Sequence, residues 1–426
     1  MRHALLYPGV LLALFLRCGG EAPTSAPTAS ETPAPAAIPT PAVPPPETAR
    51  EPIPCDGFAL PVREVRSPIA VPNTAELTAA RAVLERVVRT HGLDPGNPWA
   101  IGHALIALGP TARLPGDIDP VDHLFATYAE EVQVDGVTRV RFPRSRGDVR
   151  IEPHTDLLLK AFAEIGVAPG RTVTVAGVQH TVGDLVCHSL DRAWVDGDDV
   201  AFDSWNDTPW SLQGLSTYAP IGLKWTADGG HPMSLDGFAS AVVAKHRSEV
   251  GFIHEAMRNG QTFQKRKQGI FGYTCGGAHL LQGAAFAVGR GVGGEPARES
   301  LRADVSTWFA RYAVEMRMLD AAIQQYPEYR LKLVVQRLKF LGHFTESAHK
   351  LAAVGLLEPD EAQARILAAV LSGLVDTVSA LEASGVLDKL PELRASDEQL
   401  YLDVIGDSAH AMRGIDLATG ASSLRL

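Results

Sequence analysis

The spacing of apolar residues predicts that most of the chain is α-helical. Four long segments carry apolar side chains three and four positions apart, which is the pattern of a helix that buries one face. Thr74, Ser234 and Asp360 stand where the first residues of such helices need a side-chain cap. The four predicted amphipathic helices span residues 74–92, 234–260, 297–325 and 359–385.

Shorter and more apolar segments alternate with these long ones. Residues 97–109 and 208–220 each begin with a capping residue, Asn97 or Thr208, followed by proline and tryptophan. Residues 275–289, 346–357 and 407–420 each carry an Ala-His pair near the predicted helix start. We therefore expect the histidines of these pairs to occupy equivalent positions in successive helices.

Two β-hairpins are predicted between the helices. Residues 130–142 alternate between apolar and polar positions around Asp135-Gly136, and residues 171–182 do so around Ala176-Gly177. Each is too short to build a sheet domain, so both are read as small insertions.

The repetition of helix pairs, one helix apolar and one amphipathic, resembles the (α/α) toroid architecture. Terpenoid cyclases, lanthionine cyclases and many polysaccharide lyases and glycosidases share this ring of helical hairpins. The resemblance implies that the apolar helices line the centre and the amphipathic ones form the outside. An irregular helical bundle and an open helical repeat are the alternatives. The zinc motifs of lanthionine cyclases are not matched, because Cys187-His188 is followed by Ser189 and precedes Cys275.

Residues 1–18 resemble a bacterial lipoprotein signal segment. A basic start and an apolar run over residues 4–16 lead to Cys18, which would carry the lipid. Arg17 stands where that family places a small residue, so an uncleaved anchor or a later start codon are the alternatives. Residues 19–54 form a Pro/Ala/Thr-rich tether, and residues 55–426 form one large helical domain. We expect a membrane-anchored lipoprotein of the cell envelope, in the periplasm or on the outer surface.

Charge and cysteine content narrow the function classes further. A net charge of −10 and a pI near 5.8 argue against nucleic acid as a partner. If Cys18 is lipidated, the three remaining cysteines form at most one disulfide in an oxidising compartment. The sequence does not select the pair among Cys55, Cys187 and Cys275.

Histidines of the predicted inner helices are the first candidates for chemistry. His279, His349 and His410 are expected to converge for acid–base or metal work, and packing between helices is the alternative for each. Glu346 and Asp407 precede two of them by three residues, so each pair lies on one helix face. The resulting candidate set for a divalent metal is Glu346, His349, Asp407 and His410.

Carboxylates, aromatic rings and one cysteine complete the candidates. Asp203 and Asp207 are the expected carboxylate partners. Cys275 and His279 could hold zinc or form a reactive thiolate, whereas a disulfide through Cys275 is the alternative. The residues expected to bind substrate at the cavity rim are Trp99, Trp210, His103 and His154.

The leading hypothesis is an envelope enzyme with a polar central cavity. It would be a hydrolase or lyase that acts on an envelope polysaccharide or another polar or carbohydrate ligand. A metal-dependent enzyme with a His/carboxylate site and a non-catalytic helical scaffold are the alternatives. An arginine cluster over residues 139–150 makes an anionic ligand conceivable, with a solvated loop as its alternative.

Overall fold

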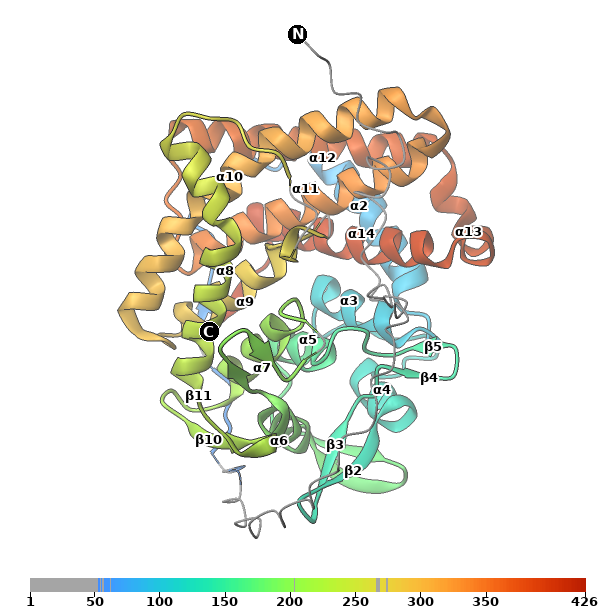
Figure 1. The fold of residues 1–426 in the computed structure, drawn as a ribbon. Coiled ribbons are helices and arrows are strands. Elements are labelled where there is room, and N and C mark those ends of the chain that lie inside the picture. Colours follow the sequence, from blue (N-terminus) through green and yellow to red (C-terminus); the bar gives the residue numbers. More distant parts are fainter. Residues whose placement is uncertain are drawn as a thin grey trace, which may run out of the picture.

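The structure of the protein is a computed structural model. It describes residues 53, 55, 57–61, 63–202, 204–265, 269–272 and 275–426. The predicted signal segment with Cys18, the tether and Asp203 lie outside the described residues, so what was expected of them remains a prediction. The described chain is mainly helical, with small antiparallel strand pairs (Figure 1). The predicted fold class, mainly α with β-hairpin insertions, is confirmed.

Six helices form an inner ring. In chain order each packs against the next, and the last packs against the first, so the ring closes. Their side chains are buried on nearly every face, and in α11 and α14 this burial includes polar residues such as Glu346 and Asp407. The inner helices are α3 (Pro98–Leu108), α5 (Leu157–Ile165), α7 (Thr208–Tyr218), α9 (Ala278–Gly289), α11 (Arg330–Ala353) and α14 (Glu398–Ala418).

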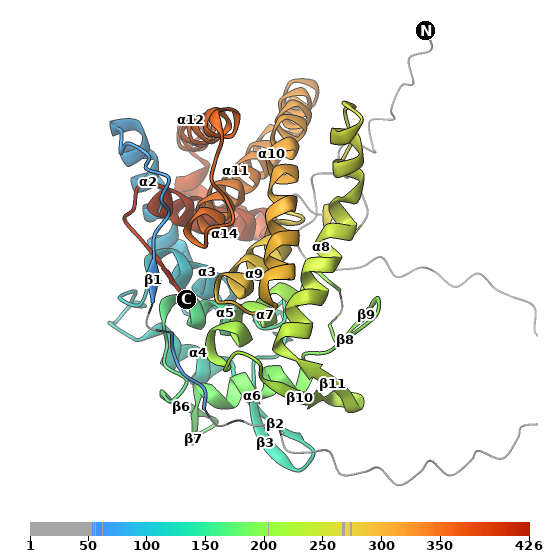
Figure 2. The same ribbon diagram turned by 90° about the vertical axis from the view of Figure 1, so that its left-hand side faces the viewer.

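The amphipathic helices lie outside this ring and alternate with the inner ones along the chain. The outer helices are α2 (Ala75–Val87), α4 (Pro120–Tyr128), α6 (Val182–Arg192), α8 (Leu235–Arg258), α10 (Gly294–Gln325) and α12 (Glu361–Ala383), with the short α13 (Leu390–Ser396) beside α14. The long α8 and α10 pack side by side (Figure 2). Within the described residues, α12 alone is long and apolar enough to cross a membrane, and it packs against α11 and α2.

Short irregular turns continue or connect these helices. A π-helical turn extends α2 over Val88–Gly92. The 3₁₀ turns cover Asp228–Gly230, Gly269–Gly272, Pro327–Tyr329 and Val386–Lys389.

Both predicted hairpins are present. Strands β2 (Glu130–Val134) and β3 (Val137–Arg141) pair, as do β6 (Thr172–Val175) and β7 (Val178–Thr181). The two central residues of each turn have positive φ, from 49° at Asp135 to 87° at Gly177, as primed hairpin turns require.

Further strand pairs were not predicted, because most of their strands have only two residues, which is too short for alternation to be recognised. They are β4 (Ser145–Arg146) with β5 (Val149–Arg150), β8 (Val195–Asp196) with β9 (Asp199–Val200), β10 (Lys224–Ala227) with β11 (His231–Ser234), and β1 (Glu64–Val65) with β12 (Leu424–Arg425).

Two connections hold the ends of the described chain in place. A disulfide joins Cys55 to Cys187 in α6, at a sequence separation of 132. The β1–β12 pair joins the N-terminal segment to the C-terminus. The pairing that the sequence left open is therefore Cys55–Cys187, and Cys275 is buried outside this disulfide.

Several helix boundaries differ from the prediction. The Ala-His pairs at His349 and His410 do not lie near helix starts, because α11 begins at Arg330 and α14 at Glu398. Apolar periodicity continues through both helices, and Gly342 and Gly406 lie within them without ending them. Helix α9 begins at Ala278, so Cys275 precedes it. Thr208 is the first residue of α7 and not its cap.

Candidate functional site

Histidines from the inner ring converge on one cavity. The cavity has a volume of about 40 Å³ and receives side chains from every inner helix or from the turn before it. His103 comes from α3, His154 from the turn before α5, His279 from α9, His343 from α11 and His410 from α14. Trp99 of α3 and Trp210 of α7 also line it.

The five imidazoles form a continuous chain of ring contacts. Ring centroids are 4.0 Å apart for His343 and His410, and 5.1 Å for His279 and His343. His103 lies 5.4 Å from His410, and His154 lies 6.1 Å from His279. The structure thus brings together four of the histidines that the sequence singled out.

His343 was missed by the sequence analysis. It follows a glycine, Gly342, as His103 follows Gly102. Each of these glycines lies within van der Waals reach of a neighbouring inner helix, Gly342 near Ala411 and Gly102 near Leu158. The repeated Gly-His pair on an apolar helix is the signal that would have identified His343.

His349 does not belong to the cavity, contrary to prediction. It lies six positions after His343, which turns its side chain by about 120° to another face of α11. There its Nδ1 lies 2.9 Å from Oγ of Ser67 in the N-terminal segment. The Glu346–His349 pair therefore does not face a common ion.

The predicted metal set is consequently not assembled. Glu346 bonds His410 through Oε2 and Nδ1 at 2.7 Å. Asp407 lines the cavity, where its Oδ2 lies 3.8 Å from Nζ of Lys339. Lys339 also pairs with Asp403 at 2.9 Å. Asp407, which the i, i+3 spacing pairs with His410, thus lies at the cavity wall within ion-pair distance of Lys339.

Asp207 does provide a carboxylate to a cavity histidine. Its Oδ1 lies 2.7 Å from Nδ1 of His154, and Asp207 is almost completely buried. A carboxylate at Nδ1 fixes the tautomer and leaves Nε2 as the proton acceptor. The His154–Asp207 pair has the composition of a general base with its orienting group.

The two predicted rim tryptophans lie against cavity histidines. The ring of Trp99 is 4.1 Å from that of His103, and the ring of Trp210 is 4.5 Å from that of His279. Trp210 is buried and Trp99 is half-buried. These contacts restrict the rotation of both imidazoles and exclude water from their edges.

Burial keeps the central imidazoles uncharged. Desolvation, and then the neighbouring His410, hold the pKa of His103 and of His343 well below the ordinary value. Burial and His154 have the same effect on the pKa of His279. Neutral imidazoles have a free lone pair at pH 7, which is the form that binds a metal ion.

Two groups of donor atoms have the spacing of a metal site. The donor atoms of Cys275, His279 and His343 all lie within 4.8 Å of one another, and so do those of His343, Glu346 and His410. Zinc bond lengths place tetrahedral ligands about 3.5 Å apart, so either group needs only a small contraction.

The first of these groups fits an ion better than the second. Both ring nitrogens of His279 and Nδ1 of His343 are buried without a hydrogen-bond partner in the described part of the chain. Such orphaned nitrogens are unfavourable unless a ligand satisfies them. Glu346, by contrast, is already engaged by Lys350 and His410.

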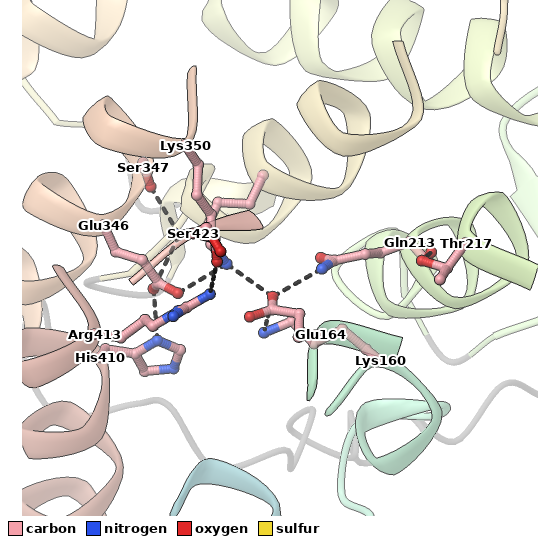
Figure 3. A network of polar contacts seen from close by, with 11 residues as sticks. Lys160, Glu164, Gln213, Thr217, Glu346, Ser347, Lys350, His410, Arg413 and Ser423 are labelled. Carbon is pink, nitrogen blue, oxygen red and sulfur yellow. Dashed lines mark hydrogen bonds and ion pairs between the residues drawn. The ribbon is translucent and has the colours of Figure 1, made fainter. Parts of the chain in front are cut away.

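A buried ionic network lies next to the cavity histidines (Figure 3). Nζ of Lys350 is 2.8 Å from carboxylate oxygens of both Glu164 and Glu346, and Nζ of Lys160 is 3.0 Å from Glu164. Gln213 donates to Glu164 at 2.7 Å. The two lysines and two glutamates balance in charge and come from α5 and α11.

This network keeps Glu346 ionised. Burial opposes the charge, but the ammonium of Lys350 and the hydrogen bond from His410 outweigh it and hold the pKa of Glu346 well below its ordinary value. An ionised Glu346 accepts the N–H at Nδ1 of His410 and directs Nε2 toward the cavity.

Comparison with protein-family models, with curated protein sequences and with solved structures finds no match for this chain.

Proposed function

We propose that this chain is a metal-dependent hydrolase or lyase whose ion is held by Cys275, His279 and His343. The observation that carries the proposal is the convergence of these three donors on one cavity, with both nitrogens of His279 buried and unsatisfied. Two imidazoles and a thiolate are the donor set that zinc prefers. Three protein ligands leave a fourth position for water or substrate.

The cavity volume supports an ion and a small group more than a bound polymer. About 40 Å³ holds an ion with one water molecule, whereas pockets for drug-sized ligands measure about 300–1,000 Å³. The reacting group would therefore be a narrow polar end of the substrate. A polysaccharide substrate, the leading hypothesis from the sequence, finds less support here than the metal-dependent alternative.

The residues around the ion take complementary roles in this proposal. A bound zinc ion would lower the pKa of its water ligand and polarise a substrate oxygen. His154, oriented by Asp207 at 2.7 Å, accepts the proton from the attacking water or from the substrate. His410 donates its Nδ1–H to Glu346, so its Nε2 is placed to accept a hydrogen bond beside His343.

Elemental analysis of the purified full chain tests the metal proposal. We expect about one zinc ion per chain, lost by at least tenfold in His279→Gln. His349→Gln is the matched control, because this buried histidine also has an unsatisfied Nε2 but lies outside the cavity. Equal metal content in both variants, or none in the native chain, would contradict the proposal.

The convergence of the histidines also favours an enzyme over the scaffold alternative. In a scaffold there is no reason for five imidazoles to share one small cavity with a His–Asp pair. We further infer that the closed ring of alternating inner and outer helices is of the (α/α) toroid type.

We also propose that the protein acts in the cell envelope. The Cys55–Cys187 disulfide supports an oxidising compartment, in agreement with the lipoprotein-type segment that ends at Cys18. Radiolabelled palmitate should label the native chain in bacterial cells and not the Cys18→Ala variant. Labelling of both chains, or of neither, would contradict lipidation at Cys18.

A further inference from the structure

Two residues in the wall of the histidine cavity have a buried polar atom that the proposed metal centre does not use. Oδ1 of Asn206 and Nε1 of Trp210 have no hydrogen-bond partner among the residues that the structure describes. Asn206 is 6% exposed and Trp210 is 4% exposed. A buried polar atom without a partner is unfavourable, so both atoms point to a ligand in the cavity.

Both residues lie beside the groups to which the chemistry is assigned. Asn206 directly precedes Asp207, whose Oδ1 holds Nδ1 of His154 at 2.7 Å. The ring centroid of Trp210 is 4.5 Å from that of His279 and 5.8 Å from that of His154. The indole thus contacts both a proposed metal ligand and the proposed general base. A substrate group between the ion and the base is therefore next to it.

The hydrogen-bonding character of the two atoms selects the chemical group that fits. Nε1–H of an indole only donates, and Oδ1 of an asparagine only accepts. An ester or a ketone would satisfy Trp210 with its carbonyl oxygen but leave Asn206 without a donor. An amide with an N–H offers an acceptor and a donor in one rigid plane, so it satisfies both.

The charges of the cavity wall disfavour an anionic group. The charged side chains that line it are Lys339, Asp403 and Asp407, which leaves one negative charge in excess. A zinc ion with the thiolate of Cys275 and two neutral imidazoles would add one positive charge. The complete site is then neutral, which suits a neutral reacting group such as an amide.

We propose that the group on which this enzyme acts is an amide that carries an N–H. Its carbonyl oxygen accepts from Nε1 of Trp210, and its nitrogen donates to Oδ1 of Asn206. The carbonyl oxygen has a second lone pair, so it can accept from the indole and still face the ion. This inference rests on the proposed function, because it takes the histidine cavity as the active site of a hydrolase.

The hydrolytic step balances with the groups at the site. The oxygen of water bonds to the carbonyl carbon while His154 takes one of the water protons. The carbon–nitrogen bond then breaks, and His154 returns this proton to the leaving nitrogen. The products are a carboxylic acid and an amine, and no oxidant or reductant takes part.

Titration of the EDTA-treated full chain with acetamide and with acetone tests the recognition of the amide. The two probes have the same shape and the same carbonyl group, but a methyl group replaces the NH₂ group in acetone. We expect acetamide to bind at least tenfold more tightly, because acetone leaves Asn206 unsatisfied. This preference should disappear in Asn206→Leu. Equal affinities in the native chain, or a preference that persists in Asn206→Leu, would overturn the proposal.

Nuclear magnetic resonance of the indole N–H groups follows the second contact. Acetamide should move the Nε1–H resonance of Trp210 downfield, and Trp210→Phe, which identifies this resonance, should weaken acetamide binding at least tenfold. Trp225→Phe is the matched control. Trp225 is 5% exposed and its Nε1 also lacks a partner within the described chain, but it is not among the residues that line the cavity. An unmoved Trp210 resonance, or equal effects of the two variants, would contradict the contact.

Failure of this inference can be distinguished from failure of the metal proposal. Acetamide binding is measured on the metal-free chain, whereas zinc content is measured on the untreated chain. Trp210→Phe keeps an aromatic ring against His279, so we expect it to retain zinc. A chain that binds acetamide but purifies without zinc would overturn the metal centre alone. A chain that carries zinc but does not bind acetamide would overturn the amide assignment alone.

Discussion

At the scale of single residues, the ionic network next to the histidines depends on each charge having its partner. Lys350 bridges Glu164 and Glu346, and Glu346 in turn orients His410. All four side chains are buried. A buried charge that loses its counter-ion is costly, whereas an exposed pair contributes little.

The Glu346→Gln variant should therefore be strongly destabilised. Removal of one carboxylate leaves two buried lysines with a single glutamate, and we expect a loss of about 3–5 kcal/mol in the free energy of unfolding. Urea denaturation at pH 7 measures this loss. Glu361→Gln is the control, since Glu361 pairs with Arg365 at the same i, i+4 spacing but is 91% exposed. A loss below about 1 kcal/mol in Glu346→Gln would contradict the role given to the network.

The residue scale also shows what the sequence could predict. The composition of the site, histidines with Asp207 and two tryptophans, was recognised from local motifs at helix starts. The choice among histidines was not, because His349 and His343 differ only in the helix face they occupy. That face is fixed by the packing of α11 on α14, and the local signal for it is Gly342 before His343, which repeats Gly102 before His103.

At the scale of elements, glycines allow the inner helices to approach closely. A Cβ atom at Gly283 of α9 would lie 2.6 Å from the backbone oxygen of Pro209 at the start of α7. At Gly414 of α14 it would lie 2.9 Å from the backbone nitrogen of Glu346. Backbone atoms cannot move aside as a side chain does, so these contacts fix the spacing of the ring.

Opposite effects are expected for alanine at an inner and at an outer glycine. Gly283→Ala should cost about 1–3 kcal/mol, because the methyl group forces α9 away from α7. Gly251→Ala on α8 should stabilise the protein by up to about 1 kcal/mol, because nothing lies within 4 Å and alanine favours the helix. Thermal unfolding of both variants checks this. A stabilised Gly283→Ala variant would mean that α7 and α9 are not in close contact.

Whether a segment is a helix or a hairpin could be predicted where its pattern of apolar residues is long. The residues at which several helices begin could not be predicted. The capping box at Asp360 and Gln363 marks the start of α12, and the two hairpins follow from Asp135-Gly136 and Ala176-Gly177. The starts of α11 and α14 were missed because inner helices are buried on every side and lack an amphipathic boundary. The strand pair β8–β9 was missed because two residues per strand carry no period.

At the scale of the whole molecule, the N-terminal segment is attached both to an outer helix and to the C-terminal strand. The Cys55–Cys187 disulfide links it to α6, and β1 pairs with β12 at the C-terminus. Cys55→Ser should lower the free energy of unfolding by about 2–5 kcal/mol, because the disulfide constrains the unfolded chain over a loop of 132 residues. Denaturation with and without reductant measures the effect. A reductant-sensitive Cys55→Ser variant would contradict the pairing.

The burial of neutral histidines throughout the molecule predicts a steep loss of stability in mild acid. Burial lowers the pKa of His188 to about 3 and of His349 to about 4, and it holds His103, His279 and His343 well below the ordinary 6.5. The unfolded chain therefore binds more protons below pH 6.5 than the folded chain does. The stability that these groups contribute is present above pH 6.5 and is lost as the pH falls toward the folded values.

Between pH 7 and pH 5.5, each of these histidines should lower the free energy of unfolding by about 1 kcal/mol. This pH range lies well above the one in which carboxylates with a lowered pKa, such as Glu346, begin to titrate. Urea denaturation in the presence of EDTA measures the slope without metal binding. His349→Gln should reduce the loss by about 1 kcal/mol, since its pKa of about 4 comes from burial alone. A free energy of unfolding that stays constant from pH 7 to pH 5.5 would show that water reaches these imidazoles, and it would remove the physical basis for a dry metal centre within the ring.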